Sequence, residues 1–377
     1  MKKIIIICVL VLMLLNVFGC NKDPENDICF IQVSAGDSHA VALDENGVVY
    51  TWGYNAGGQL GLGKTSRKEP LNKIKLNVKI NQVVAGDYFT IVLDENNNLW
   101  QTGKSEVCNE YSFTMLNIET KFKYVSAGDA HVLAIDEKGN IWAWGDNKNG
   151  QLGVGLKEKD YTFVPRKVET DINFSIVEAG QQYSLAIDND GNIWAWGINE
   201  DGQLGNGEKG DSQYINPICK KSPVQITNGT RFIKLAAGKT HSLALDIEGN
   251  VWAWGNNFDG QLGDGTNQYS LTPKKVFCDK NITNITAGDY HSIILDKFGK
   301  SYACGFNEYG RLGLGNVESQ NTFVEIPKIE LEYVNAGATF SMGIDKQKNI
   351  VSWGYNQYWQ LGTDTLGYEK TPIMPFE

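Results

Sequence analysis

The chain has 377 residues, with 44 acidic and 34 basic side chains and a formal net charge of −10 at pH 7. Proteins that bind nucleic acid through its phosphates carry a basic face, so this balance argues against a nucleic-acid partner.

The first 27 residues predict export and attachment to a membrane. Residues 1–3 are Met-Lys-Lys, and residues 4–15 form an apolar run of 12 residues that fits a signal-peptide core and is too short to span a bilayer. Residues 17–20, Val-Phe-Gly-Cys, resemble a bacterial lipobox, in which Cys20 is lipidated and becomes the new N-terminus. The alternatives are an ordinary secretory signal and an uncleaved anchor. We therefore expect a signal peptide at 1–19 and a polar tether at 20–27, which would hold an exported domain at a membrane of the cell envelope.

Between residues 28 and 376 one sequence pattern is repeated seven times. Residues 237–265 read AGKTHSLALDIEGNVWAWGNNFDGQLGDG, and similar copies begin at the other Ala-Gly pairs. The seven marker glycines are separated by steps of 50, 42, 52, 58, 50 and 49 residues: Gly36, Gly86, Gly128, Gly180, Gly238, Gly288 and Gly337. A period near fifty that is rich in glycine and aromatic residues is typical of propeller blades.

Each copy predicts about four short antiparallel strands. Residues 241–246 alternate large side chains with small or polar ones, which is the period of a strand. Asp246 to Asn250 has the composition of a hairpin turn, and residues 251–254, Val-Trp-Ala-Trp, form the returning strand. Gly-Gln-Leu-Gly at 260–263 then leads into a variable fourth strand. One copy is therefore one blade.

These motifs closely resemble the repeats of the regulator of chromosome condensation family. The shared elements are Ala-Gly-x-x-His, then Leu-x-x-x-Gly-x-h-Trp-x-Trp-Gly-x-Asn, where h is hydrophobic, then Gly-Gln-Leu-Gly. The resemblance implies an all-β, seven-bladed propeller. Propellers of this family serve as exchange factors, enzyme inhibitors and interaction platforms, so the resemblance indicates fold more strongly than function.

Positions shared by the copies are interpreted as scaffold. The aspartate before the hairpin is present in all seven copies and predicts turn chemistry: Asp44, Asp94, Asp136, Asp188, Asp246, Asp296 and Asp345. One position holds all four histidines in four copies and Phe89, Tyr183 or Phe340 in the others, which predicts a packing position: His39, His131, His241 and His291. No motif for a catalytic site, a metal site or a cofactor is found, so none of the three is expected.

Positions that differ between copies are the candidates for binding. Aromatic residues recur after Trp-Gly and between Ala-Gly and the histidine position, and Trp359 replaces a glycine of the other copies. Aromatic side chains act as anchors in protein interfaces, whereas the alternative for each is packing between blades. The candidate partner-binding residues are Tyr54, Tyr88, Phe258, Tyr290, Phe306, Tyr309, Tyr355, Tyr358 and Trp359.

Several departures from the repeat carry further expectations. Blade two lacks the Trp-Gly-x-Asn and Gly-Gln-Leu-Gly segments, which predicts a shortened outer half. Blade four has an insertion at 208–222, which is either part of a partner-binding wedge or an inert loop. We expect a strand at 28–33 to lie beside a strand at 371–376 and to close the ring. The cysteines in the repeats indicate free thiols, with one or two disulfides as the alternative: Cys29, Cys108, Cys219, Cys278 and Cys304.

The sequence thus predicts a non-catalytic scaffold that presents loops of one propeller face to a protein partner at the cell envelope. The first alternative is a guanine-nucleotide exchange factor for a small GTPase, which an export signal argues against. The others are an enzyme inhibitor of the β-lactamase-inhibitor propeller type and a binder of cell-wall glycans.

Overall fold

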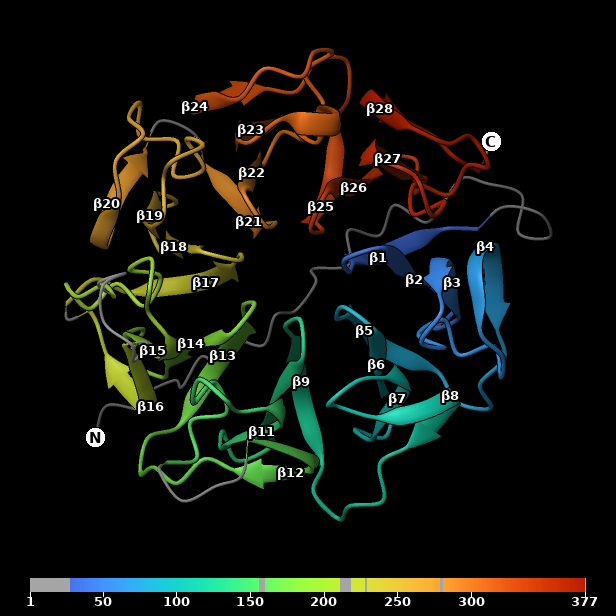
Figure 1. Cartoon of the computed structure of the whole chain (residues 1–377), viewed down its shortest axis with the longest axis horizontal. Coiled ribbons are helices and arrows are strands. Elements are labelled where there is room, and N and C mark those ends of the chain that lie inside the picture. The colour runs from blue at the N-terminus through green and yellow to red at the C-terminus, as the bar shows by residue number, and fades with distance from the viewer. Residues whose placement is uncertain (1–27, 156–159, 211–217, 228, 279–280, 377) are drawn as a thin grey trace, which may run out of the picture.

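A computed structural model describes residues 28–155, 160–210, 218–227, 229–278 and 281–376. The strands form seven four-stranded antiparallel sheets, arranged as blades around a common axis (Figure 1). The predicted all-β, seven-bladed propeller is confirmed. The predicted signal segment 1–19, Cys20 and the rest of the tether lie outside the described residues. Within the described ranges, the search for a helix with the length and apolarity of a membrane span finds none.

Each blade consists of four consecutive strands, with the first strand nearest the axis and the fourth at the outer rim (Figure 1). The strands of blades one to four are β1 (Phe30–Ala35), β2 (His39–Asp44), β3 (Val49–Asn55), β4 (Ser66–Ile74), β5 (Ile80–Ala85), β6 (Phe89–Asp94), β7 (Leu99–Lys104), β8 (Asn109–Met115), β9 (Phe122–Ala127), β10 (His131–Asp136), β11 (Ile141–Asp146), β12 (Tyr161–Lys167), β13 (Phe174–Ala179), β14 (Tyr183–Asp188), β15 (Ile193–Ile198) and β16 (Cys219–Gln225). Those of blades five to seven are β17 (Phe232–Ala237), β18 (His241–Asp246), β19 (Val251–Gly255), β20 (Ser270–Phe277), β21 (Ile282–Ala287), β22 (His291–Asp296), β23 (Ser301–Gly305), β24 (Gln320–Glu325), β25 (Leu331–Ala336), β26 (Phe340–Asp345), β27 (Ile350–Tyr355) and β28 (Tyr368–Ile373), with a short 3-10 turn, η1 (Glu308–Gly310), in blade six.

The aspartate before each hairpin organises the turn between the second and third strands. In blade five the Asp246 carboxylate accepts the backbone N–H groups of Glu248 and Asn250 at 3.0 and 2.9 Å. It also accepts the Trp252 indole N–H at 2.9 Å, which ties the turn to the returning strand. The hydrogen bonds hold the pKa of the Asp246 carboxyl below its usual value even though burial opposes this. The predicted role in turn chemistry is confirmed.

The histidine position joins each blade to the next. Four buried histidines each meet a serine or threonine hydroxyl of the following blade through Nε2, and we call each of these contacts a histidine lock. The four locks are His39 with Thr90 at 2.9 Å, His131 with Ser184 at 3.0 Å, His241 with Ser292 at 2.8 Å, and His291 with Ser341 at 2.9 Å. The predicted packing role of this position is confirmed.

The hydroxyl group shows which partner donates in the hydrogen bond of each histidine lock, because the hydroxyl gives its own hydrogen to a third group. Ser184 donates at 2.7 Å to the Gln151 carbonyl, in the loop that carries Gly-Gln-Leu-Gly in the preceding blade. The other three locks repeat this bond. The His131 Nε2–H must therefore donate to the Ser184 oxygen, while His131 Nδ1 is buried without a partner. Burial lowers the pKa of His131 to about 3, so its ring is neutral.

Three seams between blades are built differently. Between blades four and five Tyr183 replaces histidine; its hydroxyl donates to the His241 carbonyl at 2.5 Å and, unlike histidine, accepts a hydrogen bond from the next hydroxyl, Ser242. At the other two seams both partners are apolar. Phe89 of blade two takes the histidine position and Val132 of blade three the hydroxyl position, and Phe340 of blade seven and Ala40 of blade one do the same. Histidine is thus always followed by a hydroxyl in the next blade, and phenylalanine never is.

The loop between the third and fourth strands also binds the next blade. Four buried tryptophans donate their indole N–H to a carbonyl of this loop in the preceding blade: Trp52 to Gln360 at 3.0 Å, Trp196 to Gln151 at 2.8 Å, Trp254 to Gln203 at 2.9 Å, and Trp353 to Arg311 at 2.8 Å. The loop between the third and fourth strands is therefore both a turn within its own blade and a connection to the next blade.

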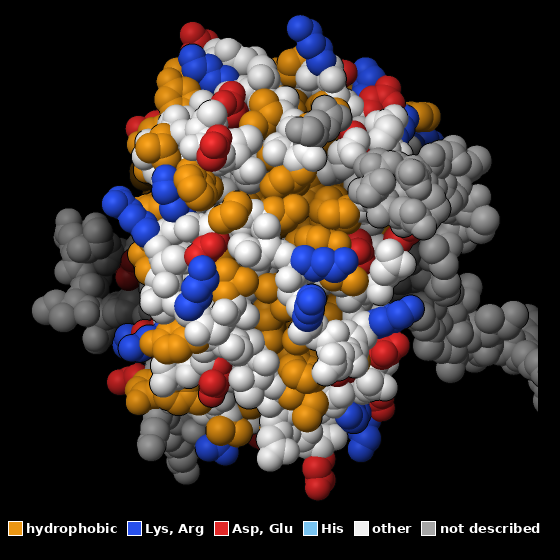
Figure 2. All heavy atoms as spheres, turned by 90° about the vertical axis from the view of Figure 1, so that its right-hand side faces the viewer, with side chains coloured by type: hydrophobic (Ala, Val, Ile, Leu, Met, Phe, Trp, Pro, Cys, Tyr) orange, Lys and Arg blue, Asp and Glu red, His pale blue; other side chains and the backbone are white. Residues whose placement is uncertain are grey.

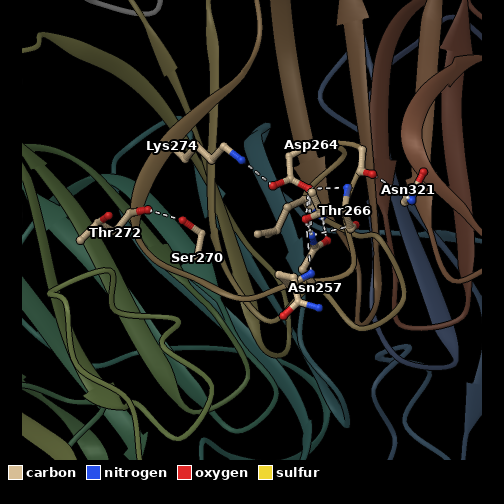
Figure 3. Close-up of polar contacts among 10 residues, drawn as sticks. Asn257, Asp264, Thr266, Ser270, Thr272, Lys274 and Asn321 are labelled. Carbon is tan, nitrogen blue, oxygen red and sulfur yellow. Dashed lines mark hydrogen bonds and ion pairs between the residues drawn. The ribbon is translucent and has the colours of Figure 1, made fainter.

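Figure 3 shows this loop in blade five. The Asn257 amide donates to the Asp264 carboxylate at 3.0 Å, and Lys274 on β20 forms an ion pair with the same carboxylate at 2.8 Å. Asn321 on β24 of blade six donates to the Gly265 carbonyl at 3.2 Å. The repeated asparagine thus shapes the loop, and the loop in turn contacts the neighbouring outer strand.

Blade two differs from our expectation. Its outer strand β8 is seven residues long and pairs with β7, so the outer half is not shortened. Only the connection between these strands is short, residues 105–108. Because the connecting loop is missing, the Trp144 indole N–H of blade three is buried without a hydrogen-bond partner.

The prediction of ring closure by neighbouring terminal strands is wrong. β1 is the inner strand of blade one, whereas β28 is the outer strand of blade seven. Side chains and single backbone bonds close the ring instead. The Ala35 N–H donates to Asn335 at 2.8 Å, and the Phe376 ring packs edge-on against Trp52 at 5.4 Å. Four consecutive strands satisfy each sheet, so no strand is exchanged.

Candidate protein-binding face

The topology gathers both variable loops of every blade at one end of the propeller. The strands are antiparallel, so the loop between the first and second strands lies at the same end as the loop between the third and fourth strands. We call this end the loop face and the opposite end, which carries the aspartate turns, the hairpin face. All nine candidate aromatic residues belong to loops or strand ends of the loop face.

Three candidate tyrosines form a cluster across three blades. The Tyr54 ring of blade one lies 6.1 Å from Tyr88 of blade two and 4.8 Å from Tyr358 of blade seven, measured between centroids. Tyr88 is 41% exposed, and the other two rings are partly exposed. The cluster therefore offers aromatic surface to solvent while its rings support one another.

A second group continues this cluster into blade six. The Tyr309 ring lies 4.8 Å from Tyr355 and 6.0 Å from Tyr368, a residue of β28 that the sequence did not single out. Tyr355 and Tyr358 both belong to blade seven, so each group of rings includes a residue of that blade. We name the combined set the tyrosine ladder: Tyr88, Tyr54, Tyr358, Tyr355, Tyr309 and Tyr368.

The remaining four candidates lie apart from the ladder. Tyr290 and Phe306 pack together in blade six with centroids 6.4 Å apart. Phe258 is 65% exposed and packs on Tyr269 within blade five. Trp359 takes the left-handed φ of 65° that glycine adopts in other copies, and the Lys68 ammonium lies 4.0 Å from its ring.

Four aspartates that the sequence reasoning did not name surround the axis on the loop face. Each directly follows the glycine of an Ala-Gly pair, and we call them the acidic mouth: Asp37, Asp87, Asp129 and Asp289. The glycines of successive Ala-Gly pairs approach one another so closely that a Cβ on Gly128 would lie 2.1 Å from the Gly180 carbonyl. An acidic residue at this position in four of seven copies is the signal that would have found the cluster.

Crowding of the acidic mouth changes its protonation. Burial, followed by the charges of Asp37 and Asp129, raises the pKa of Asp87 to about 8. Burial also raises the pKa of Asp289, to about 7, although Lys239 acts against it from 3.6 Å. The mouth is therefore only partly ionised at neutral pH.

The outer rim carries mixed charge. Figure 2 shows the side of the propeller that lies on the right in Figure 1, where basic and acidic side chains alternate and hydrophobic side chains lie between them. Among the described residues of this side, neither sign gathers into a broad field of the kind that binds nucleic acid.

The other features that bear on the sequence predictions are metal ligands, the cysteines and the insertion at 208–222. Within the described ranges, no group of three or more His, Cys, Asp or Glu is placed to hold a metal ion. Cys108, Cys219, Cys278 and Cys304 carry free thiols, as expected, whereas Cys29 is disulfide-bonded, so the free-thiol interpretation is wrong for Cys29. Of the insertion 208–222, residues 219–222 form the start of outer strand β16, residues 211–217 lie outside the described residues, and Glu208 pairs with Lys220 at 2.8 Å.

Comparison with known proteins agrees with this fold. Residues 108–375 match the RCC1-like domain, and residues 46–93 and 30–59 match the regulator of chromosome condensation (RCC1) repeat. Among solved structures, Prp20p of Saccharomyces cerevisiae, which binds Gsp1p and histones, superposes with a TM-score of 0.75 at 22% identity, over 85% of this chain and 84% of that one. Human WBSCR16 gives a TM-score of 0.78 at 20% identity, over 88% and 94% of the two chains.

Curated relatives are similar over part of their length. The ultraviolet-B receptor UVR8 of Arabidopsis thaliana is 29% identical over 260 residues, which cover 65% of this chain and 57% of that protein. The E3 ubiquitin-protein ligase HERC2 of Homo sapiens is 28% identical over 263 residues, which cover 65% of this chain and 5% of that protein. The matched region thus spans 57% of one of these relatives and 5% of the other.

Proposed function

Because this chain belongs to the RCC1-like domain family, we propose that it is a non-catalytic scaffold whose loop face binds a protein partner at the cell envelope. The tyrosine ladder is the observation that carries this proposal. Its two groups of packed rings come from blades one, two, six and seven of a closed ring. A rigid ring presents such a surface with little loss of conformational entropy on binding.

Tyrosine suits this role for physical reasons. Each ring supplies a large apolar contact area with only two side-chain torsions to immobilise, and its hydroxyl group keeps a polar contact. The nearby acidic mouth adds carboxyl groups that favour basic side chains on the partner. These features support recognition of a folded protein surface.

Removal of the ladder is expected to abolish partner capture. In the full chain, Tyr54→Ala with Tyr358→Ala removes the centre of the ladder, so envelope proteins retained by the parent chain should be lost. Phe298→Ala is the matched control, because this ring is 64% exposed on the hairpin face. Affinity capture followed by mass spectrometry measures the result. Retention of the same proteins by the ladder variant, or equal loss from the Phe298 variant, would refute the assignment of the face.

The exchange-factor alternative predicts a different readout. An exchange factor accelerates release of bound nucleotide from a small GTPase, whereas a scaffold leaves that rate unchanged. The likeness to Prp20p is 22% in sequence and supports the fold alone. Nucleotide release from a captured GTPase, measured with and without the chain, therefore separates the two functions.

The envelope address rests on the sequence of residues 1–20. If Cys20 carries the lipid, Cys20→Ala should move the protein from the membrane fraction to the soluble envelope fraction. Cys278→Ala, which removes an exposed free thiol, is the control. Fractionation followed by immunoblotting measures the change, and an unaltered membrane association of the Cys20 variant would count against lipidation.

A further inference from the structure

An open cavity lies at the seam between blades two and three. Its volume is about 500 Å³, and its walls are β7, β8 and the connection between them in blade two, with Phe163 on β12 of blade three. This volume falls in the range of pockets that hold small ligands.

The cavity exists because blade two has a short connection between its third and fourth strands. In five other blades the longer loop reaches the outer strand of the next blade, where its last glycine donates its N–H to a carbonyl at 2.8 to 3.0 Å. In blade two, Val107 and Cys108 fill the buried core against Trp144, and the chain then passes directly into β8. The core is therefore complete at this seam, and the open space lies beside it, next to the outer strand β12.

The walls of the cavity carry both hydrogen-bond donors and acceptors, and their charges balance. The Lys104 ammonium only donates, the Glu110 carboxylate only accepts, and the Asn109 amide does both. All three residues are exposed, so a ligand that enters from the solvent can reach them. An anionic ligand would meet the like charge of Glu110, and a cationic ligand that of Lys104. A neutral ligand with several polar groups fits these walls better.

Gln101 on β7 adds a polar group that lacks a partner. Its side-chain oxygen is buried and accepts no hydrogen bond from any described residue. In blades one and seven the equivalent Thr51 and Ser352 donate to the leucine carbonyl of the loop at 2.9 and 2.7 Å, a partner that blade two does not have. Because a buried acceptor without a donor is unfavourable, Gln101 favours a ligand that brings an O–H or N–H group.

Phe163 gives the cavity an aromatic wall. Its ring is 47% exposed, and the Tyr161 ring packs edge-on against it at 5.4 Å between centroids. The face of an aromatic ring carries partial negative charge, so it attracts C–H groups as well as offering apolar contact. The cavity thus combines one aromatic wall with hydrogen-bonding groups of both kinds.

We infer that this cavity binds a pyranose ring of a neutral glycan. A sugar ring has C–H groups on its face, which pack on Phe163, and hydroxyl groups around its edge. Each hydroxyl both donates and accepts, so one ring can donate to Gln101 and Glu110 while it accepts from Lys104. A peptide strand would present its polar groups along its two edges, whereas the polar groups of the cavity come from both β7 and β8. The site shares no residue with the tyrosine ladder, and a glycan is a ligand beyond the protein partner proposed for that surface.

Saturation-transfer NMR with the full chain tests for the ligand class. The probes are neutral trisaccharides of glucose, galactose, mannose and N-acetylglucosamine, with trialanine as the peptide probe, all at millimolar concentration. We expect at least one trisaccharide to receive saturation, most strongly at its ring C–H protons, and trialanine to receive none. Saturation of trialanine, or of no trisaccharide, would overturn the inference.

Substitutions in the full chain locate the bound sugar. Gln101→Leu removes the unpaired acceptor and Phe163→Ala removes the exposed ring, and each should weaken trisaccharide binding about tenfold, measured by titration of the saturation signal. Tyr111→Ala is the matched control, because Tyr111 is the equivalent ring at the preceding seam, 42% exposed, where the loop of blade one reaches its strand. Undiminished binding by either site variant, or an equal loss from the control, would contradict the site. The Tyr54 and Tyr358 double variant should bind the trisaccharide as the parent chain does, so failure of the ladder hypothesis and failure of this one give different results.

Discussion

Replacement of Ser184 by valine is expected to lower the free energy of unfolding by about 1–3 kcal/mol. The hydroxyl accepts the His131 Nε2–H and donates to the Gln151 carbonyl, and all of this lies in the fully buried seam between blades three and four. Without the hydroxyl, either tautomer of His131 leaves a buried N–H unpaired, because Nδ1 has no partner either. The Gln151 carbonyl keeps its bond from Trp196.

A second substitution should reverse most of this loss. His131→Phe together with Ser184→Val reproduces the Phe89 and Val132 pair that the chain already uses between blades two and three. A double-mutant cycle in guanidinium chloride should therefore show a coupling of about 1–3 kcal/mol. Additive effects of the two substitutions would show that the lock does not contribute to stability.

The same double variant is expected to resist acid better than the parent chain. His131 is neutral in the folded state with a pKa of about 3, whereas histidine in an unfolded chain has a pKa near its ordinary value of 6.5. Between these values only the unfolded chain binds the proton. The stability of the parent relative to the variant should therefore fall by about 1.4 kcal/mol per pH unit, or about 2 kcal/mol between pH 6.5 and pH 5.

The parent chain must be compared with the double variant, because other buried groups change the pH dependence of stability in the opposite direction to His131. Burial raises the folded-state pKa of Asp87, Asp289 and Glu178 to about 7 or 8, so these carboxyls still bind protons in the folded protein at pH values where they are ionised in the unfolded chain. The folded protein therefore loses stability as the pH rises above the unfolded-state pKa of these groups. Both proteins retain these groups, so their effects cancel in the difference. Chemical denaturation at pH 7, 6 and 5 measures it, and a difference that does not change with pH would refute a neutral buried His131.

The repeat made the fold predictable from sequence. Seven copies of Ala-Gly, the aspartate turn and Trp-x-Trp each specify strand, turn and strand, and the structure places them accordingly. The histidine position was recognised as packing because phenylalanine replaces it. Its partner was not recognised, because Ser184 lies 53 residues from His131 and only the order of the blades brings them together.

The candidate site was predictable in residue type but not in arrangement. The structure joins Tyr54, Tyr88 and Tyr358 through loops of three blades, whereas Trp359 is held under Lys68 instead. The acidic mouth escaped notice because each aspartate looks like an ordinary turn residue in its own copy. Only the closed ring places these carboxyls close enough for neighbouring charges to add to the effect of burial in raising the pKa of Asp87 and Asp289.

The absence of an exchanged strand, together with the uneven distribution of histidine locks, divides the ring into two arcs. At the seams of Phe89 with Val132 and of Phe340 with Ala40 both partners are apolar, whereas the Tyr183 seam keeps a hydrogen bond to Ser242. Blades one and two therefore form one arc and blades three to seven the other. Under mechanical load, a closed ring of blades is expected to separate first at the seams with the weakest contacts. Mechanical pulling should therefore release the two-blade arc before the five-blade arc yields, giving the molecule two steps of extension instead of one.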